Sequence, residues 1–553
     1  MVKSVIENKY EIWLTISIAT AILFSFSGLK IAFSSPYIVQ DDARQYIFWM
    51  QQFSDPELFA NDLIANYFQS VTPVGFINLY RFVSSLAIDI FWFNKISTLI
   101  LCITTTIYCF LVCIEIFPVP FAGFLSSLLI NQNLWMVDDL SSGTPRAYIY
   151  VLLLAFIYYL LKNKLIPCLI TIVLQGLFYP VAVLISITVL FIRILRFQKL
   201  SKVGLYGLFT GILILVIYSL QISEFAPIVT VNEAKVLPEF LPQGRSAFFT
   251  NSFTQFWLTD RRSGLFPIEW QYSLMCAYGI GLWWLKQLPD KFPLVKKIDR
   301  NIAIIGELAI ASILLFFLAH ILLFKLHLPG RYTHHTSRII IALIDGITLA
   351  IVFQRINVWL RNKINKNYVL WQLVSIILLL SPLLYPTYAI QSYPERLGYV
   401  RGESPQLYQF LQQQPKDIRI ATLSKEANFI PSLAARSVLV AEEYAIPYHR
   451  GYYKQISQRV RDLITVQYSN EKSVITSFIQ QYNINLFIID RQSWNANYLE
   501  SNPWLQQFEP EIDRAIKDLE NKQNLILKQY SDLCNIFQTK DIMVIDSDCI
   551  LKK

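Results

Sequence analysis

Two adjacent carboxylates follow the first apolar run of the sequence. Asp41 and Asp42 stand a few residues beyond the run 12–33, and Arg44 follows them closely. Charged side chains at a membrane boundary are costly unless they are solvated, paired or used in chemistry. The alternative is a solvated turn in which an aspartate caps a helix, but a cap needs only one carboxylate. We therefore interpret Asp41 and Asp42 as candidate catalytic residues and Arg44 as a candidate for substrate binding.

The residues after this acidic pair have an amphipathic pattern. Ile47 to Phe53 combine apolar side chains with two glutamines, and Trp49 is a residue type that anchors helices at membrane interfaces. We expect an interfacial helix that lies along the membrane surface. Asp41 and Asp42 would then stand at its N-terminus, at the membrane boundary.

A second acidic pair precedes a polar turn. Asp138 and Asp139 are followed by Pro145 and Arg146. The two acidic pairs could divide base and positioning roles, or they could share a divalent cation, which prefers hard oxygen ligands. An ordinary polar loop is the alternative. A divalent metal ion is therefore the one cofactor that the sequence suggests, its presence stays open, and its candidate ligands are Asp41, Asp42, Asp138 and Asp139.

Arginines gather in two further polar stretches. Arg331 and Arg338 lie in the stretch 325–338, and another arginine pair lies in the stretch 221–267. Guanidinium groups can contact phosphate oxygens with two parallel hydrogen bonds, which makes them suitable for binding a phosphorylated substrate. The substrate-binding candidates are Arg44, Asp138, Asp139, Arg146, Arg261, Arg262, Arg331, Tyr332 and Arg338.

Long apolar runs must position these side chains. Hydrophobic residues make up 54% of the 553 residues and charged residues only 16%, which is more apolar surface than one soluble core could bury. The apolar runs approach the length of roughly 20 residues that crosses a bilayer. The sequence predicts a polytopic α-helical membrane protein of about 11 transmembrane helices, namely 12–33, 96–117, 119–136, 148–161, 165–178, 180–195, 204–220, 268–285, 302–324, 339–354 and 368–389.

The basic residues indicate the orientation. The net charge of +9 comes mainly from short loops between apolar runs, where lysine and arginine mark the cytoplasmic side rather than a nucleic-acid surface. We predict a multi-pass protein of the plasma (inner) membrane, with a cytoplasmic N-terminus and no nucleic-acid partner. An odd number of spans places the C-terminus on the extracytoplasmic, or periplasmic, side. The same topology makes four loops of the transmembrane domain 1–390 external: 34–95, 137–147, 221–267 and 325–338.

Residues 391–553 differ in composition from the rest of the chain. Short aliphatic runs at 418–424, 437–442, 486–490 and 542–546 are typical of buried strands, and amphipathic stretches between them are typical of helices. We predict an extracytoplasmic α/β domain. It contains Cys534 and Cys549, for which a disulfide is permitted in that compartment but not required.

The pattern Asp41-Asp42-Ala-Arg44 after the first helix resembles the first external loop of GT-C glycosyltransferases, above all of the protein-mannosyltransferase and aminoarabinose-transferase group. The Arg331-Tyr332 pair is similar to a segment in their late external loops. The resemblance implies a GT-C-like fold, with an aspartate of the motif as the catalytic residue. The lysine and double proline usual in the group are absent near Pro73, so a catalytically inactive scaffold of the same fold is an alternative.

The resemblance also implies a reaction of the cell envelope. Nucleotide sugars are held in the cytoplasm, whereas a polyprenyl-phosphate sugar donor reaches an external site from the bilayer. Asp41 or Asp42 would act as general base in an inverting transfer to a glycan, lipid or protein acceptor, and arginines would hold the leaving phosphate. A membrane transporter of lipid-linked or small polar substrates is the alternative from another class.

Overall fold

The computed structural model describes residues 10–197, 201–221, 223–266, 281–363 and 394–553. Five of its helices are long and apolar enough to cross a membrane. A helix satisfies its backbone hydrogen bonds internally, as a hydrocarbon environment requires. These helices indicate an integral membrane protein, and they are α2 (Tyr10–Ala32), α6 (Ile90–Ile116), α12 (Lys202–Leu220), α15 (Ala303–Ile321) and α16 (Pro329–Lys363).

Shorter apolar helices complete the bundle. The stretch 165–195 forms two helices, as predicted, with a break at Tyr179 and Pro180. Of the other predicted spans, 368–389 lies outside the described residues and 268–285 lies mostly outside them, so the count of eleven stays a prediction. The shorter helices are α7 (Pro120–Leu134), α9 (Tyr148–Leu161), α10 (Leu165–Phe178) and α11 (Val181–Phe197).

Small residues let two of these helices approach closely. A Cβ atom added to Gly346 of α16 would lie 2.6 Å from the backbone nitrogen of Ser126 in α7. Small residues at such crossings allow the backbones of two helices to touch. This close packing matters in a membrane, because lipid supplies no hydrophobic driving force for helix association. The close contact anchors α16, the helix that carries Arg331 and Arg338.

The prediction of a loop over 325–338 is wrong for the residues from Pro329 onward. Helix α16 begins at Pro329, so Arg331, Tyr332 and Arg338 all belong to a helix. Proline is favourable at the first helical position, because its missing N–H needs no partner there. The polar residues that look like a loop are tolerated in a helix because both arginines meet the carboxylate of Asp139, which comes from another segment.

The segment between α2 and α6 folds into short elements beside the bundle. The predicted interfacial helix is wrong: Phe48–Phe53 form a short helix whose Trp49 is fully buried. Phe48 contacts Tyr444 of the C-terminal part with a ring separation of 5.3 Å. An apolar face therefore packs on protein rather than on lipid. The elements here are β1 (Ile38–Gln40), α3 (Ala43–Tyr46), η1 (Phe48–Phe53), α4 (Leu63–Val71) and α5 (Val74–Ser85).

The C-terminal part contains a five-stranded sheet of order β4-β3-β5-β7-β6. The strands β3 (Arg419–Ala421), β4 (Ser437–Val438), β5 (Leu486–Asp490) and β7 (Ile542–Asp546) match the four predicted runs. Strands β3, β4 and β5 are parallel, and β7 is antiparallel to β5. Cys534 and Cys549 form a disulfide, which settles the pairing that the sequence left open.

The remaining elements of the C-terminal part surround this sheet. The edge strand β6 (Asn535–Gln538) was not predicted, because its residues alternate between half-buried and exposed. The helices are α18 (Pro405–Gln412), α19 (Ile430–Leu433), α20 (Arg450–Gln467), α21 (Lys472–Tyr482), α22 (Ala496–Glu500), α23 (Glu511–Glu520), α24 (Ile526–Leu533) and α25 (Ser547–Lys552).

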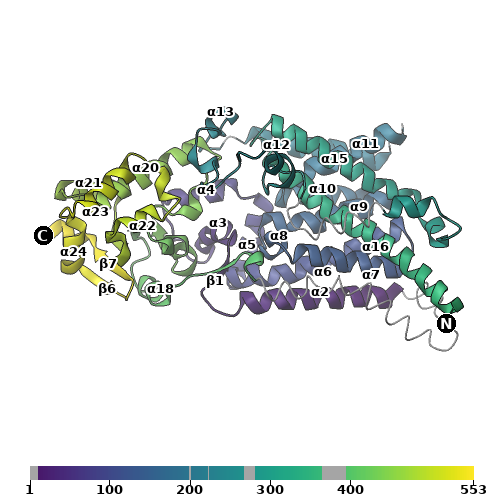
Figure 1. The fold of residues 1–553 in the computed structure, drawn as a ribbon, viewed down its shortest axis with the longest axis horizontal. Coiled ribbons are helices and arrows are strands. Elements are labelled where there is room, and N and C mark those ends of the chain that lie inside the picture. The colour runs from purple at the N-terminus through teal and green to yellow at the C-terminus, as the bar shows by residue number, and fades with distance from the viewer. Residues whose placement is uncertain (1–9, 198–200, 222, 267–280, 364–393) are drawn as a thin grey trace.

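The bundle and the C-terminal sheet lie at opposite ends of an elongated molecule (Figure 1). Strand β1 pairs with β2 (Tyr399–Arg401) in antiparallel register, with Ile38 opposite Arg401. One hydrophobic core also runs from the segment after α2 into the C-terminal part. The residues after the first helix are therefore held between the two ends of the molecule.

Candidate functional site

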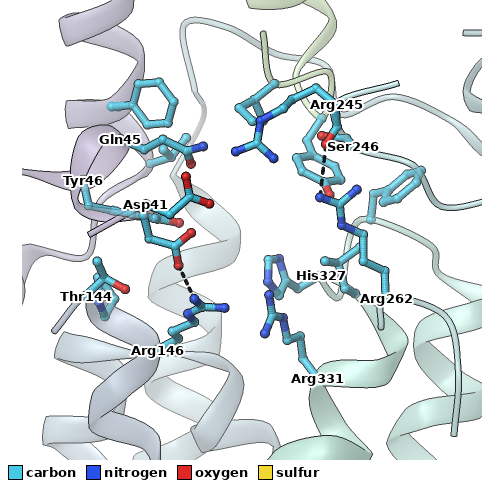
Figure 2. Close-up of a pocket in the computed structure, with 18 of the residues that line it drawn as sticks. Asp41, Gln45, Tyr46, Thr144, Arg146, Arg245, Ser246, Arg262, His327 and Arg331 are labelled. Carbon is cyan, nitrogen blue, oxygen red and sulfur yellow. Dashed lines mark hydrogen bonds and ion pairs between the residues drawn. The ribbon is translucent and has the colours of Figure 1, made fainter. Parts of the chain in front are cut away.

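A cavity of about 460 Å³ lies where the bundle meets the C-terminal part. Its lining comes from six separate segments of the chain. They are the segment after α2, the stretch before α9, the break between α10 and α11, the loop between α12 and residue 266, the stretch that leads into α16, and the loop before α20. Figure 2 shows Asp41 facing Arg245, Arg262 and Arg331 across this cavity.

Asp41 and Asp42 form one side of the cavity, named here the carboxylate wall. Strand pairing positions them, because the backbone N–H of Asp41 donates to the carbonyl oxygen of Gly398 at 2.7 Å. Gly398 has a φ of +68°, a conformation that favours glycine. Asp42 stands at the N-cap position of α3, but its side chain caps no backbone N–H. Both carboxylates are thus free to face the cavity.

Each carboxylate of this wall has a different arginine partner. Asp41 pairs with Arg44, and Asp42 Oδ2 lies 2.7 Å from Arg146 Nη2. Burial raises the pKa of Asp42, Arg146 acts to lower it, and the neighbouring carboxylates of Asp138 and Asp41 raise it further. A carboxylate with a raised pKa is a better proton acceptor than an ordinary one.

One residue of the second acidic pair lines the cavity, and the other does not. Asp138 begins α8 (Asp138–Ser141), lines the cavity and pairs with Arg146 at 2.8 Å and with Arg261. Although burial acts to raise the pKa of Asp138, Arg146 and Arg261 outweigh it and hold this pKa below its usual range. Asp138 is therefore a permanent anion that anchors two arginines.

Asp139 lies beneath the cavity and is almost fully buried. It pairs with Arg338, and the hydroxyl of Tyr150 donates to its Oδ2 at 2.7 Å. Burial acts to raise the pKa of Asp139, but Arg338 and His335 reverse the effect and hold it well below its usual range. Asp139 and Arg338 were predicted to bind substrate, but neither lines the cavity. They instead support the residues that do.

Four arginines face the carboxylate wall and are named here the arginine wall: Arg245, Arg261, Arg262 and Arg331. Within the described part of the chain, the Arg262 guanidinium donates to backbone oxygens, with Nη1 donating to Ala247 O at 2.9 Å. Burial lowers the pKa of Arg262, and the nearby guanidiniums of Arg245 and Arg331 lower it further. Crowded guanidiniums favour an anionic ligand that would neutralise them.

His327 adds a neutral group to this side. It lines the cavity between α15 and α16. Burial, followed by the charge of Arg331, lowers the pKa of His327 to about 3. The imidazole is therefore uncharged at neutral pH and can offer either a donor or an acceptor.

Two further predicted substrate-binding residues do not line the cavity. Arg44 is buried behind the carboxylate wall, where it joins Asp41 to Glu443. Tyr332 is fully buried, and its hydroxyl donates to the carbonyl oxygen of Leu326 at 2.7 Å. Because successive residues of a helix point about 100° apart, Arg331 can face the cavity while Tyr332 cannot.

The carboxylates do not fit a metal centre in this arrangement. Among the described residues, no group of three or more histidine, cysteine or acidic side chains could hold a metal ion. Asp41, Asp42, Asp138 and Asp139 are each paired with a guanidinium, which competes with a hard cation for the carboxylate oxygens.

Residues of this site that were missed in the sequence include His327, Arg245, Glu443 and His449. Arg245 is a lone arginine in a long loop, and Glu443 and His449 lie in the aromatic-rich stretch before α20, which packing explains equally well. Their contacts with the cavity depend on folding across more than a hundred residues. Only the adjacent acidic residues at 442–443 gave a local signal.

Comparison with known proteins identifies the fold. No protein-family model matches the sequence, and no curated protein is significantly similar to it. The apo crystal structure of the Archaeoglobus fulgidus oligosaccharyltransferase aligns with a TM-score of 0.50 at 12% identity, covering 89% of this chain and 72% of that one. The A. fulgidus enzyme AglB, in complex with an inhibitory peptide and a dolichol-phosphate, aligns with a TM-score of 0.52 at 12% identity, covering 92% and 72%.

A third structure is the arabinofuranosyltransferase AftD from Mycobacteria. It aligns with a TM-score of 0.46 at 12% identity, covering 86% of this chain and 35% of that one. The likeness to the archaeal enzyme shows that this chain has the fold of the GT-C glycosyltransferases, as the resemblance in the sequence predicted.

Proposed function

We propose that the chain is a glycosyltransferase that moves a sugar from a polyprenyl-phosphate-linked donor to an extracytoplasmic acceptor. The observation that carries this proposal is the single cavity in which Asp41 and Asp42 face Arg245, Arg262 and Arg331. A base on one side and cations on the other are what the transfer of a sugar away from a phosphate requires.

The donor would bind with its phosphate at the arginine wall. Guanidiniums pair with phosphate oxygens and can stabilise the negative charge that grows as the bond to the sugar breaks. The fold supports a lipid carrier, because AglB, which shares it, has been solved with a dolichol-phosphate and an inhibitory peptide.

The reaction would be a single displacement. The carboxylate of Asp42, or of Asp41, accepts the proton of the acceptor hydroxyl as its oxygen bonds to the anomeric carbon of the sugar. The bond between that carbon and the phosphate oxygen breaks, and the polyprenyl phosphate leaves with both electrons. One displacement inverts the anomeric centre. Asp42 is the better candidate base, because burial raises its pKa.

The location follows from the same reasoning. We place the N-terminus in the cytoplasm and the cavity with the C-terminal domain 391–553 outside the plasma (inner) membrane. A lipid-linked donor then reaches the cavity from the bilayer. The apolar helices of the bundle support this membrane setting.

Replacing Asp41 and Asp42 separately with asparagine tests the proposal. Cells that carry each variant, the wild type or a deletion are compared for extracytoplasmic glycans and glycolipids. We expect Asp42→Asn to lose the product that the deletion loses. If both variants keep the wild-type product, the catalytic assignment is wrong, and a scaffold of the same fold becomes the better explanation.

A further inference from the structure

One carboxylate of the C-terminal part reaches into the site from behind the cavity. Glu443 is only 4% exposed in its side chain and accepts hydrogen bonds from three side chains of other segments. Arg44 Nη2 donates to its Oε2 at 2.6 Å, and Arg245 Nη2 donates to its Oε1 at 2.7 Å. Gln45 Nε2 also donates to Oε1, at 2.5 Å.

These partners belong to opposite sides of the cavity. Arg44 and Gln45 follow the carboxylate wall directly, and Arg44 also pairs with Asp41. Arg245 is part of the arginine wall. Glu443 therefore joins Asp41, through Arg44, to a guanidinium that faces it across the cavity.

The Glu443 carboxylate is itself held firmly. Glu443 lies in η9 (Glu442–Tyr444), and its backbone N–H donates to Asn428 Oδ1 at 2.9 Å. Burial raises the pKa of Glu443, while Arg245 and Arg44 act to lower it. Two buried guanidiniums that share one carboxylate lose their common counter-ion if that carboxylate is removed.

We propose that Glu443 is a positioning residue that fixes the separation between the carboxylate wall and the arginine wall. The inference rests on the proposed function, since it assigns the two walls to acceptor activation and to phosphate binding. Glu443 touches neither substrate; it acts through Arg44 on Asp41 and directly on Arg245. A displacement reaction depends steeply on this separation, because a misplacement of about 1 Å can cost roughly 100-fold in rate.

A second buried carboxylate crosses the same interface and serves as a control. Glu239 of η3 (Pro238–Phe240) accepts from Trp504 Nε1 at 2.9 Å and from Tyr453 OH at 3.3 Å. It also accepts the backbone N–H of Arg245 at 2.8 Å, and it forms no ion pair with a guanidinium of the described residues. Glu239 thus docks the loop on the C-terminal part without pairing with a charge of either wall.

The test compares Glu443→Gln and Glu443→Asp with Glu239→Gln and Glu442→Gln in the full-length, detergent-solubilised protein. The measured quantities are kcat and donor KM with synthetic polyprenyl-phosphate sugars, using membranes of the deletion strain as acceptor, and the thermal unfolding temperature. We expect Glu443→Gln to lower kcat by about 100-fold with a smaller change in donor KM. Glu443→Asp keeps the charge but is one methylene shorter, and we expect an intermediate loss of about 10-fold.

The controls separate positioning from stability. Glu239→Gln should lower the unfolding temperature but leave kcat within about threefold of wild type, and Glu442→Gln should change neither. Equal losses of kcat in Glu239→Gln and Glu443→Gln would overturn the positioning role, as would a wild-type kcat in Glu443→Asp. If Glu443→Gln does not fold, the Glu443→Asp result decides. If the wild type itself transfers no sugar, both the function and the positioning role are wrong.

Discussion

Asp42 Oδ2 lies 2.7 Å from Arg146 Nη2, and the same nitrogen lies 2.8 Å from Asp138 Oδ2. One guanidinium thus joins the acidic pair after the first helix to the acidic pair before α9. Arg146 can do so because it follows Pro145 at the start of a helix, where it projects toward the cavity. The balance of charge around the candidate base depends on this one arginine.

Replacing Arg146 with glutamine should therefore destabilise the protein strongly. Removing one partner of a buried ion pair leaves an uncompensated charge, and we expect the free energy of unfolding to fall by about 3–5 kcal/mol. Denaturant unfolding of the solubilised protein measures this change. Arg261→Gln is the matched control, because its side chain is 58% exposed and, among the described residues, its ion pair is with Asp138; its loss should stay below about 1 kcal/mol. Equal losses in both variants would contradict the central role of Arg146.

Transfer should fall as the pH is lowered, since the base must be deprotonated. Burial raises the pKa of Asp42 above its ordinary value of 3.8, so the acid limb of kcat should have its midpoint above that pH. Asp138 does not contribute to this limb, because the arginines beside it hold its pKa below the ordinary value. A profile of kcat against pH measures the midpoint. A kcat that stays flat down to pH 3.8 would show that Asp42 is not the base.

Weakening the arginine wall should impair donor binding more than folding. Arg262→Met and Arg331→Met each remove a charged donor from the proposed phosphate site, worth about 1.5–3 kcal/mol, or roughly 10- to 100-fold in affinity. Titration with a short-chain polyprenyl phosphate measures the dissociation constant. Arg514→Met is the control, because Arg514 is an exposed arginine of α23, far from the cavity lining. Unchanged affinity in both cavity variants would place the phosphate elsewhere.

The disulfide predicts a thiol count. Among the described residues four cysteines are free, and the bond joins Cys534 to Cys549, so a maleimide should label the four but not the joined pair in the denatured, non-reduced protein. Replacing both with serine should lower the free energy of unfolding by about 3 kcal/mol, because the bond closes a loop with a sequence separation of 15 residues. Mass spectrometry counts the labels. Seven labelled cysteines would contradict the pairing.

Residues close to the ends of apolar runs could be predicted well. Asp41, Asp42, Asp138 and Arg331 stand next to helices, where a charge is unusual, and the fold brings all four to one cavity. The local sequence is enough to single them out, because each charge stands next to an apolar run. The same contrast predicted the strands of the C-terminal sheet, except for the half-exposed β6.

Features that depend on distant partners could not be predicted in this way. The amphipathic pattern around Trp49 is the same whether its apolar face meets lipid or another protein segment, and here it meets the C-terminal part. In the sequence, Arg245 and Glu443 look like ordinary polar residues. Only folding brings them into contact, because 198 positions separate them along the chain. The polar residues after Pro329 suggested a loop, but the carboxylate of Asp139 lets Arg331 and Arg338 remain in a helix.

The pairing of β1 with β2 has a consequence for biosynthesis. The backbone of Asp41 is held by Gly398, which the ribosome adds only after the bundle helices up to α16 have been made. Until then the nascent chain carries an incomplete cavity, and the acidic pair has no strand to order it. Chains that stop between α16 and residue 398 should therefore contain the bundle helices but lack the strand that orders Asp41. The cavity is completed only after the segment that follows the bundle has been synthesised.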